Sequence, residues 1–292
     1  MAKFKQHATS WFIMLPGIIL FGFFLWVPLL QSVRMSFYRT RNIELVEFVG
    51  FDNFISIFNR HEFRQALVNT FSYTIWSILL GFLVPIFLAL IIGETVRGKG
   101  FFRTVAYVPN VLPGLAAMIL WRAFFSAEST GVINILLGHL GIGPMTFLTE
   151  ANWVIPIIVL ISTWRGAGAT ALIYMAGLAG INPELYEAAT IDGAGIWKRI
   201  RYITAPAIFN LGSTLLILQI IAIFQIMYEP LVLTRGGPDN ASISLMLLMW
   251  NYAFGGNMDF GRASAVAVIT AVILLGFTVL YQIAQRRKVD WD

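Results

Sequence analysis

Residues 65–93 read QALVNTFSYTIWSILLGFLVPIFLALIIG, and no side chain in this stretch carries a charge. A helix needs about 20 consecutive apolar residues to cross the hydrocarbon core of a bilayer, so this stretch is long enough to span one. Inside a bilayer every backbone amide must be paired within its own segment, which favours a helix over an isolated strand. The stretch therefore predicts a transmembrane helix and decides the fold class.

The rest of the chain repeats this pattern. Hydrophobic residues make up 58% of the sequence and charged residues 12%, about half the charge of a soluble domain, which excludes a single globular core in water. We expect an all-α, polytopic membrane protein with six transmembrane helices. Their approximate ranges are 11–33, 67–93, 104–125, 153–177, 202–228 and 263–285, within a transmembrane domain over residues 11–285. Prolines within these ranges are expected to kink the helices.

Six helices place both chain ends on the same side of the membrane. Lys and Arg residues are more numerous on that side, which by the positive-inside rule is the cytoplasm. We therefore expect cytoplasmic segments at 1–10, 182–201 and 286–292. The charge bias is small, because the first outer loop, about 35–64, also contains arginines. That loop carries acidic residues too, which suits a small folded segment. The first apolar run is too long for a cleaved signal peptide and is expected to be retained.

Several function classes lack the residues that they need. The net charge is +5, but the basic residues lie between apolar runs and form no continuous nucleic-acid-binding face. Cysteine is absent and the three histidines are scattered, so we expect neither a metal site nor a cofactor. The segment 93–100 is close to a phosphate-binding loop, but Gly100 replaces the required hydroxyl and an apolar helix precedes it. Catalytic clusters are missing as well, so the chain is not expected to be an enzyme.

The loop 182–201, between the fourth and fifth spans, has the composition of a capped surface helix. Asn182 and Pro183 are typical of a helix N-cap and first turn. Acidic residues precede basic ones, as the helix dipole favours. Gly193 and Gly195 are expected to divide the loop into two short helices.

A specific spacing follows inside this loop. It runs Glu187-Ala188-Ala189, three residues, Gly193, nine residues, Ile203 and, three positions on, Pro206. This pattern resembles the EAA loop of permeases of binding-protein-dependent ABC importers, with Ala205 where leucine is usual. The resemblance implies a type I importer fold, in which a cytoplasmic coupling helix contacts a separate ATPase. The residues that it assigns to coupling are Glu184, Glu187, Ala188, Ala189, Asp192, Gly193, Ala194 and Pro206.

Weaker motifs along the chain resemble the carbohydrate-uptake, maltose-transporter-type subfamily. They include Val49-Gly-Phe-Asp-Asn-Phe54, Asn69-Thr70, Gly236-Gly237-Pro238 and Ala263-Ser-Ala265. This resemblance implies uptake of a sugar or oligosaccharide through the plasma (inner) membrane of a prokaryote. It also implies a second homologous permease in a heterodimer, two ABC ATPase subunits and an extracytoplasmic solute-binding protein.

Polar residues within apolar spans are candidates for the solute pathway. Gln225, Tyr228 and Glu229 have helical i, i+3, i+4 spacing and are expected on one face of the fifth span. The further candidates are Gln219, Arg165, Asn110 and Tyr73. Hydrogen bonding between helices is the alternative role for all of them.

The turn-rich segment 234–240 is expected on the outside. Its residues Thr234, Gly236, Gly237 and Pro238 are candidates for contact with a binding protein, and a plain hairpin connection is the alternative. At the level of function, other solutes stay open: a glycerol phosphate, an amino acid or a peptide. A secondary transporter without a motor is a further alternative.

Overall fold

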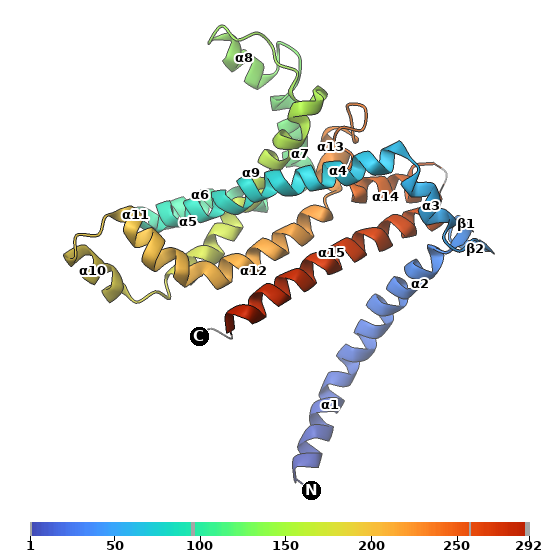
Figure 1. Ribbon diagram of the computed structural model, residues 1–292. Helices are drawn as coiled ribbons and strands as arrows, with labels where there is room; N and C mark the ends of the chain where they lie inside the picture. Colours follow the sequence, from blue (N-terminus) through green and yellow to red (C-terminus); the bar gives the residue numbers. More distant parts are fainter. Residues whose placement is uncertain (1, 95–96, 257, 290–292) are drawn as a thin grey trace. The chain divides into compact units, whose positions relative to one another are not determined.

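The computed structural model describes residues 2–94, 97–256 and 258–289, so Met1 and residues 290–292 of the two terminal segments lie outside the described residues. Most of the chain is helical (Figure 1). The first half contains α1 Ala2–Phe21, η1 Gly22–Trp26, α2 Val27–Met35, β1 Tyr38–Arg41, β2 Glu44–Phe48, α3 Asp52–Phe58, α4 His61–Trp76, η2 Ser77–Phe82, α5 Leu83–Glu94, α6 Lys99–Val111, α7 Gly114–Phe124 and α8 Val132–Gly138. The second half contains η3 Phe147–Thr149, α9 Ala151–Leu178, α10 Pro183–Ile191, α11 Ile196–Arg199, η4 Ile200–Thr204, α12 Ala205–Phe224, α13 Tyr228–Leu233, α14 Leu245–Phe254 and α15 Phe260–Val289.

Five helical segments are long and apolar enough to cross a membrane. They are Trp11–Met35, His61–Gly93, Ala151–Leu178, Ile196–Phe224 and Phe260–Arg286. The pair α6 and α7 qualifies as a sixth if it is taken as one bent span. Apart from the hairpin β1–β2, the regular elements of the described residues are helices. The chain is therefore an all-α polytopic membrane protein, as the sequence predicts.

The third span differs from the single helix expected over 104–125. Helix α6 ends at Val111, α7 begins at Gly114, and their axes meet at 94°. Leu112 between them has an extended backbone, with ψ of 138°. A residue that precedes proline is pushed out of the helical region by the proline ring, and Pro113 follows Leu112 here. The proline therefore breaks the span instead of kinking it.

Three other prolines are accommodated inside continuous helical segments. The wide π-helical segments η1, η2 and η4 lie immediately before or around the positions where Pro28, Pro85 and Pro206 enter the helix. A proline lacks the amide hydrogen and its ring clashes with the carbonyl four residues earlier, so the preceding turn widens. These spans continue as helices through the widened turns.

The chain forms two compact units: Met1–Phe63 with Leu248–Ile273, and Arg64–Leu247 with Leu274–Asp292. In the second unit α9 packs against α5, α6 and α12. Gly168 makes this packing possible, because a Cβ at this position would overlap the carbonyl of Ala106 on α6. A buried apolar cluster with Ala89, Tyr174 and Ile208 joins α5, α9 and α12.

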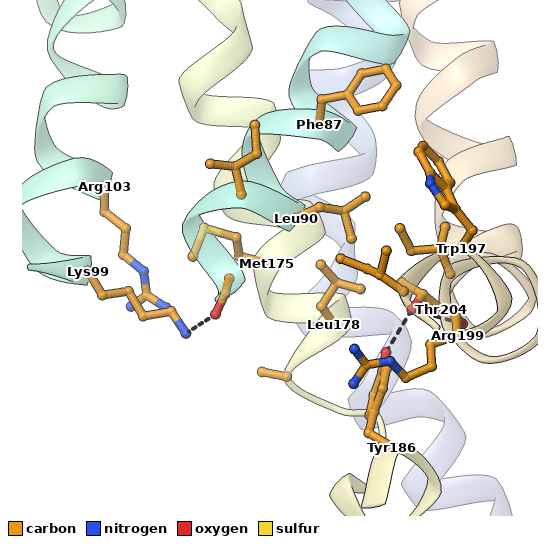
Figure 2. A pocket seen from close by; sticks show the side chains of 15 residues that line it. Phe87, Leu90, Lys99, Arg103, Met175, Leu178, Tyr186, Trp197, Arg199 and Thr204 are labelled. Atoms are coloured by element: carbon orange, nitrogen blue, oxygen red, sulfur yellow. Dashed lines mark hydrogen bonds between the residues drawn. The ribbon is translucent and has the colours of Figure 1, made fainter. Parts of the chain in front are cut away.

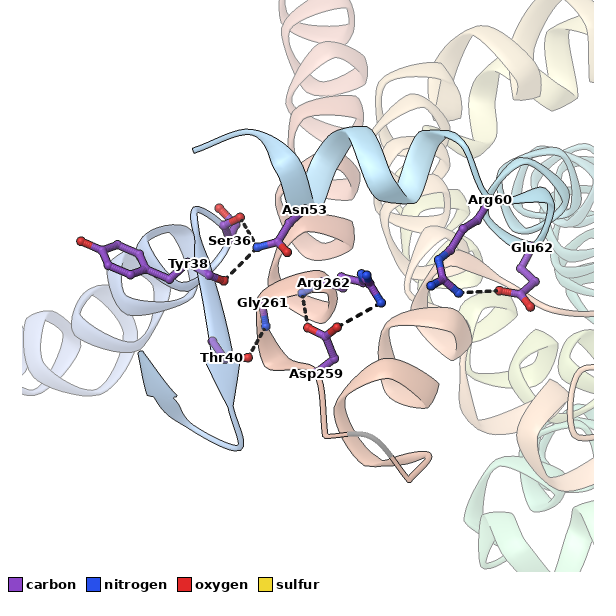
Figure 3. Close-up of polar contacts among 9 residues, drawn as sticks. All are labelled: Ser36, Tyr38, Thr40, Asn53, Arg60, Glu62, Asp259, Gly261 and Arg262. Carbon is purple, nitrogen blue, oxygen red and sulfur yellow. Dashed lines mark hydrogen bonds and ion pairs between the residues drawn. The ribbon is translucent and has the colours of Figure 1, made fainter. Parts of the chain in front are cut away.

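The first unit contains a small folded segment where the sequence predicts one (Figure 3). Strands β1 and β2 pair antiparallel, and the cross-strand partners Arg39 and Glu47 form an ion pair at 2.8 Å. Asn53 of α3 donates from Nδ2 to the carbonyls of Ser36 and Tyr38, both at 2.9 Å. These bonds fix α3 against the end of the first span.

Candidate functional site

A cavity of about 530 Å³ lies within the second unit, among η2, α9, α12 and the segment that links α12 to α13. Its polar lining comes from Ser77, Ser162, Thr163, Thr170, Gln219, Gln225, Tyr228 and Glu229. Hydroxyl, amide and carboxylate groups among apolar walls are the combination that orients a polar solute in a binding cavity. Four of the predicted pathway residues therefore line a single cavity.

The helical stripe predicted for Gln225, Tyr228 and Glu229 is wrong. Helix α12 ends at Phe224 with Gln225 as its C-cap, and α13 begins only at Tyr228. Pro230 lacks an amide hydrogen and is accommodated in the first turn of the new helix, where that hydrogen would have no partner. Ser244 donates to the carbonyl of Ile226, which the break leaves free. The three side chains reach the same cavity through a helix break.

Gln219 has a fixed amide orientation. Its Nε2 donates to the carbonyl oxygen of Ser77 at 2.9 Å and to the Ser77 hydroxyl at 2.7 Å. Gly81 leaves room for it, since a Cβ there would collide with the same amide nitrogen. The Gln225 side chain, by contrast, has no hydrogen bond to the residues that the structure describes and is exposed to the cavity. Gln219 therefore holds α12 to η2, while the amide of Gln225 is free to bind a solute.

Arg165 pairs with Glu229. The distance from its Nη1 to a carboxylate oxygen is 4.0 Å, and the two side chains are 33% and 17% exposed. The Nε of Arg165 is buried without a hydrogen-bond partner among the described residues, and the guanidinium lies against Gly114. An arginine in a spanning helix needs a counter-charge, and Glu229 supplies it. Arg165 is not among the residues that line the cavity.

Two predicted pathway residues lie elsewhere. Tyr73 is fully buried and donates its hydroxyl to the carbonyl of Ser242 at 3.0 Å. Asn110 is half-buried on α6, outside the lining of the cavity. Sequence spacing cannot distinguish a tyrosine that faces a cavity from one that is bonded to a loop. In either place the tyrosine hydroxyl has a hydrogen-bond partner.

The segment 234–240 has a defined conformation. Asn69 on α4 donates to the carbonyls of Asn240 and Ile243, at 2.8 and 3.0 Å. Thr234 and Gly237 are both bonded to the hydroxyl of Ser242, at 2.7 and 2.6 Å. Gly236 is buried with φ of +87°, a conformation that suits glycine.

The exposed side chains of the segment 234–240 differ from those predicted to contact a binding protein. Thr234, Gly237 and Pro238 are half-buried and shape the turn, whereas Arg235 and Asp239 are exposed. These two charged residues were not among the predicted contacts. Their position between turn-forming residues is the sequence signal that could have identified them.

The loop 182–201 folds into two short helices, as expected. Asn182 accepts a hydrogen bond at Oδ1 from the amide of Glu184 at 3.1 Å and caps α10. Gly193, with φ of +69°, ends the helix, and the amide of Ala194 donates back to Ala189. This is a glycine-terminated helix whose ends are both closed by local bonds.

One face of α10 is open to solvent. Glu184, Glu187 and Ala188 are exposed along it, and Asp192 and Gly193 are exposed at its end. Ala189 and Ala194 are half-buried. Sequence analysis missed two exposed apolar neighbours, Leu185 at 52% and Ile191 at 86%. Pro206 lies in the first turn of α12 and not on this face.

Helix α10 is tied to the start of α12. The hydroxyls of Tyr186 and Thr204 are 2.9 Å apart and hydrogen-bonded. Thr204 closes η4, which continues directly into α12. Helix α12 also lines the polar cavity and carries Gln219, so one hydrogen bond connects α10 to a helix of the cavity wall.

Comparison with known proteins adds independent information. The family model for the inner membrane component of binding-protein-dependent transport systems matches residues 81–290. The trehalose/maltose transport system permease protein MalF of Thermococcus litoralis is 31% identical, over 99% of this chain and 97% of its own length. The lactose transport system permease protein LacF of Rhizobium radiobacter is 30% identical, over 98% and 97%. A chain from the crystal structure of a bacterial alginate ABC transporter, in complex with its alginate pentasaccharide-bound periplasmic protein, has a TM-score of 0.84 at 30% identity and covers 98% of this chain and 96% of its own.

Proposed function

Because the chain belongs to the family of inner membrane components of binding-protein-dependent transport systems, we propose that it is the permease subunit of an ATP-driven importer of sugars or oligosaccharides. The observation that carries this proposal is the continuity of α12. At one end it is bonded through Thr204 to the exposed helix α10, and further along it lines the polar cavity. A soluble motor that moves α10 thereby acts on the solute cavity, and the chain itself is not an enzyme.

The mechanism that follows has two states. Closure of two separate ATPase subunits moves α10 and, through the Tyr186–Thr204 bond, the start of α12. The cavity then changes its exposure from the cytoplasm to the outside, where a loaded binding protein releases its solute. Such coupling needs different contacts in each state, and the helix break after Phe224 lets the segment 225–229 change its position relative to α12.

A neutral solute suits the cavity better than a phosphate ester. The described residues that line it include no lysine or arginine, and its one acid, Glu229, is paired with Arg165. An anionic glycerol phosphate would therefore meet a carboxylate without a free cation. Amide and hydroxyl groups beside apolar walls instead match sugar hydroxyls and the apolar faces of sugar rings.

The partners in this proposal are a second homologous permease, two ABC ATPase subunits and an extracytoplasmic binding protein. The most apolar window of Trp11–Met35 has none of its residues buried within the chain. A surface of this kind is available to lipid and to a second permease. We place the chain in the inner membrane of a prokaryote, with 1–10, 182–201 and 286–292 in the cytoplasm.

Transport by the reconstituted complex tests the proposal. The permease pair, the ATPase and the binding protein are placed in proteoliposomes, and uptake of neutral disaccharides and trisaccharides, glycerol 3-phosphate and amino acids is compared. We expect saccharide uptake that requires both ATP on the ATPase side and the binding protein. Uptake driven by a proton or sodium gradient without ATP would contradict the proposal and favour a secondary transporter. Uptake of glycerol 3-phosphate or an amino acid alone would correct the solute class.

A further inference from the structure

A second cavity, of about 700 Å³, lies in the second unit beside the coupling loop (Figure 2). It is bounded by the end of α5, the start of α6, the end of α9, and α11 with η4. Most of its wall is apolar and includes Phe87, Leu90, Met175, Leu178 and Trp197. Its volume falls in the range of about 300–1,000 Å³ that holds small molecules. None of the residues that line it lines the solute cavity.

Three basic side chains gather at this cavity. Lys99 donates to the carbonyl of Gly93 at 2.7 Å, and the other hydrogens of its ammonium group remain available. The Nε of Arg199 is buried without a partner, and its Nη1 is 3.5 Å from the hydroxyl of Thr190. Among the described side chains, neither these two nor Arg103 forms an ion pair with a carboxylate. The described side chains therefore give the cavity a positive rim with no carboxylate paired to it.

The cavity lies where spanning helices end. Helix α5 ends at Glu94 and α6 begins at Lys99, and both belong to candidate membrane spans, so the proposed topology brings these helix ends near the lipid headgroups. Among the lining residues, Phe87, Ile91 and Trp197 are 53%, 66% and 76% exposed. Exposed apolar and aromatic side chains at this depth face acyl chains and the lipid interface. In the proposed topology the basic residues therefore lie near the level of the lipid phosphates.

We propose that this cavity binds an anionic phospholipid. The phosphate lies against Lys99, Arg103 and Arg199, and an acyl chain packs along Phe87, Leu90 and Trp197. A soluble phosphate compound would leave the apolar wall unfilled, and a zwitterionic lipid carries a cation that would face the basic rim. A lipid with a net negative charge satisfies both parts of the site.

This site has a consequence for coupling, which rests on the proposed function. Tyr186 and Thr204 line the same cavity and form the bond that joins α10 to α12. A lipid seated there packs against that bond and restricts its motion. Anionic lipid therefore raises the amount of transport obtained per ATP hydrolysed.

Lipid binding is measured on the whole importer complex, independently of transport. The complex is placed in nanodiscs of phosphatidylcholine with a minor fraction of phosphatidylglycerol that carries a photoreactive acyl chain. We expect cross-links on the peptide that contains Phe87–Ile91, and co-purifying phosphatidylglycerol in native mass spectra. In the variant with Lys99→Gln and Arg103→Gln, affinity for this lipid falls by roughly 30-fold, since each basic residue near a membrane surface contributes about fivefold.

The matched control removes the same charge outside the cavity. Arg97 and Arg201 are exposed and do not line it, so Arg97→Gln with Arg201→Gln leaves the affinity and the cross-links unchanged. Equal losses in both double variants would overturn the proposal, as would unchanged binding in both. Inorganic phosphate at millimolar concentration is expected not to displace the lipid. Complete displacement would show a phosphate site instead, and cross-links confined to partner subunits would show that a protein covers the cavity.

Discussion

At the scale of single residues, the charged pair in the membrane-spanning unit shows how polarity is arranged here. Arg165 and Glu229 come from α9 and α13, and their partly buried side chains balance each other at 4.0 Å. Gln219 donates its amide hydrogens to Ser77. Among the described side chains that line the cavity, Gln225 is the amide without a hydrogen bond. Residues of similar chemistry thus divide into those that join helices and those whose polar groups are free in the cavity.

The ion pair makes a stability prediction. Glu229→Gln leaves the guanidinium of Arg165 without a counter-charge, and we expect a loss of roughly 1–3 kcal/mol, reduced from the fully buried case because the arginine is part-exposed. Thermal unfolding of the detergent-purified complex measures it. Adding Arg165→Met, which removes the unpaired charge, is expected to restore most of the lost stability. If Glu229→Gln alone were as stable as the wild type, the guanidinium of Arg165 would be hydrated and would not need Glu229.

The free amide makes a transport prediction. Gln225→Ala removes a hydrogen bond to solute and leaves the helix contacts intact, so we expect half-maximal uptake to need about 3- to 15-fold more loaded binding protein, the loss of one hydrogen bond. Uptake by proteoliposomes as a function of saccharide-loaded binding protein measures it. Thr278→Ala on α15, a polar residue that is absent from the cavity lining, is the control. An unchanged uptake curve for Gln225→Ala would remove this residue from the pathway.

At the scale of elements, helix packing depends on close backbone contact, and the proposed coupling depends on one hydrogen bond. The approach of α9 to α6 uses the missing side chain of Gly168. The link from α10 to α12 uses the two hydroxyls of Tyr186 and Thr204. The first contact bears on stability and the second on the proposed transmission of motion, so variants of Gly168 are expected to lose stability and variants of Tyr186 or Thr204 to lose coupling.

The glycine contact predicts a steep dependence on side-chain size. Gly168→Leu forces α6 and α9 apart and is expected to cost about 1–3 kcal/mol or more, with low yield of folded protein. Gly166→Leu, two residues away, is the control, because a Cβ there meets nothing within 4 Å. Thermal unfolding of both variants measures the difference in stability between them. Equal stability would contradict the packing described for Gly168.

The hydroxyl bond predicts an uncoupled importer. Tyr186→Phe removes one partner and keeps the ring, so we expect ATPase activity to persist while saccharide uptake per ATP falls several-fold. Thr204→Val is expected to have the same effect, and the two together no more than either alone. Tyr202→Phe is the control, since this tyrosine is 69% exposed. Uptake and hydrolysis measured on the same proteoliposomes test the prediction, and an unchanged ratio would show that α10 acts on α12 by another route.

At the scale of the whole molecule, the proposed topology separates a coupling surface from an outer surface. Helix α10 presents acidic and apolar side chains on one side, and the segment 234–240 presents Arg235 and Asp239 on the other. Their placement on opposite sides of the membrane is part of the proposed topology. It gives each soluble partner its own surface.

Topology is testable because the chain contains no cysteine. We expect Ile191→Cys, on the exposed end of α10, to react with a membrane-impermeant maleimide only after the cells are opened. Asp239→Cys in the outer loop is expected to react in intact cells. Labelling of Ile191→Cys in intact cells would place α10 outside and contradict coupling to a cytoplasmic ATPase.

The sequence by itself determined the all-α membrane fold, the apolar segments and the two short helices of the loop 182–201. These depend on local properties: the length of an apolar run, a cap residue, and a motif at fixed spacing. The end of α12 at Phe224 and the separation of Tyr73 from the cavity were decided only by the tertiary structure. Each depends on which distant groups satisfy a freed carbonyl or a buried hydroxyl, and one-dimensional spacing does not contain that pairing. For the same reason the lipid cavity is invisible in the sequence, because its basic and apolar residues come from five separate elements.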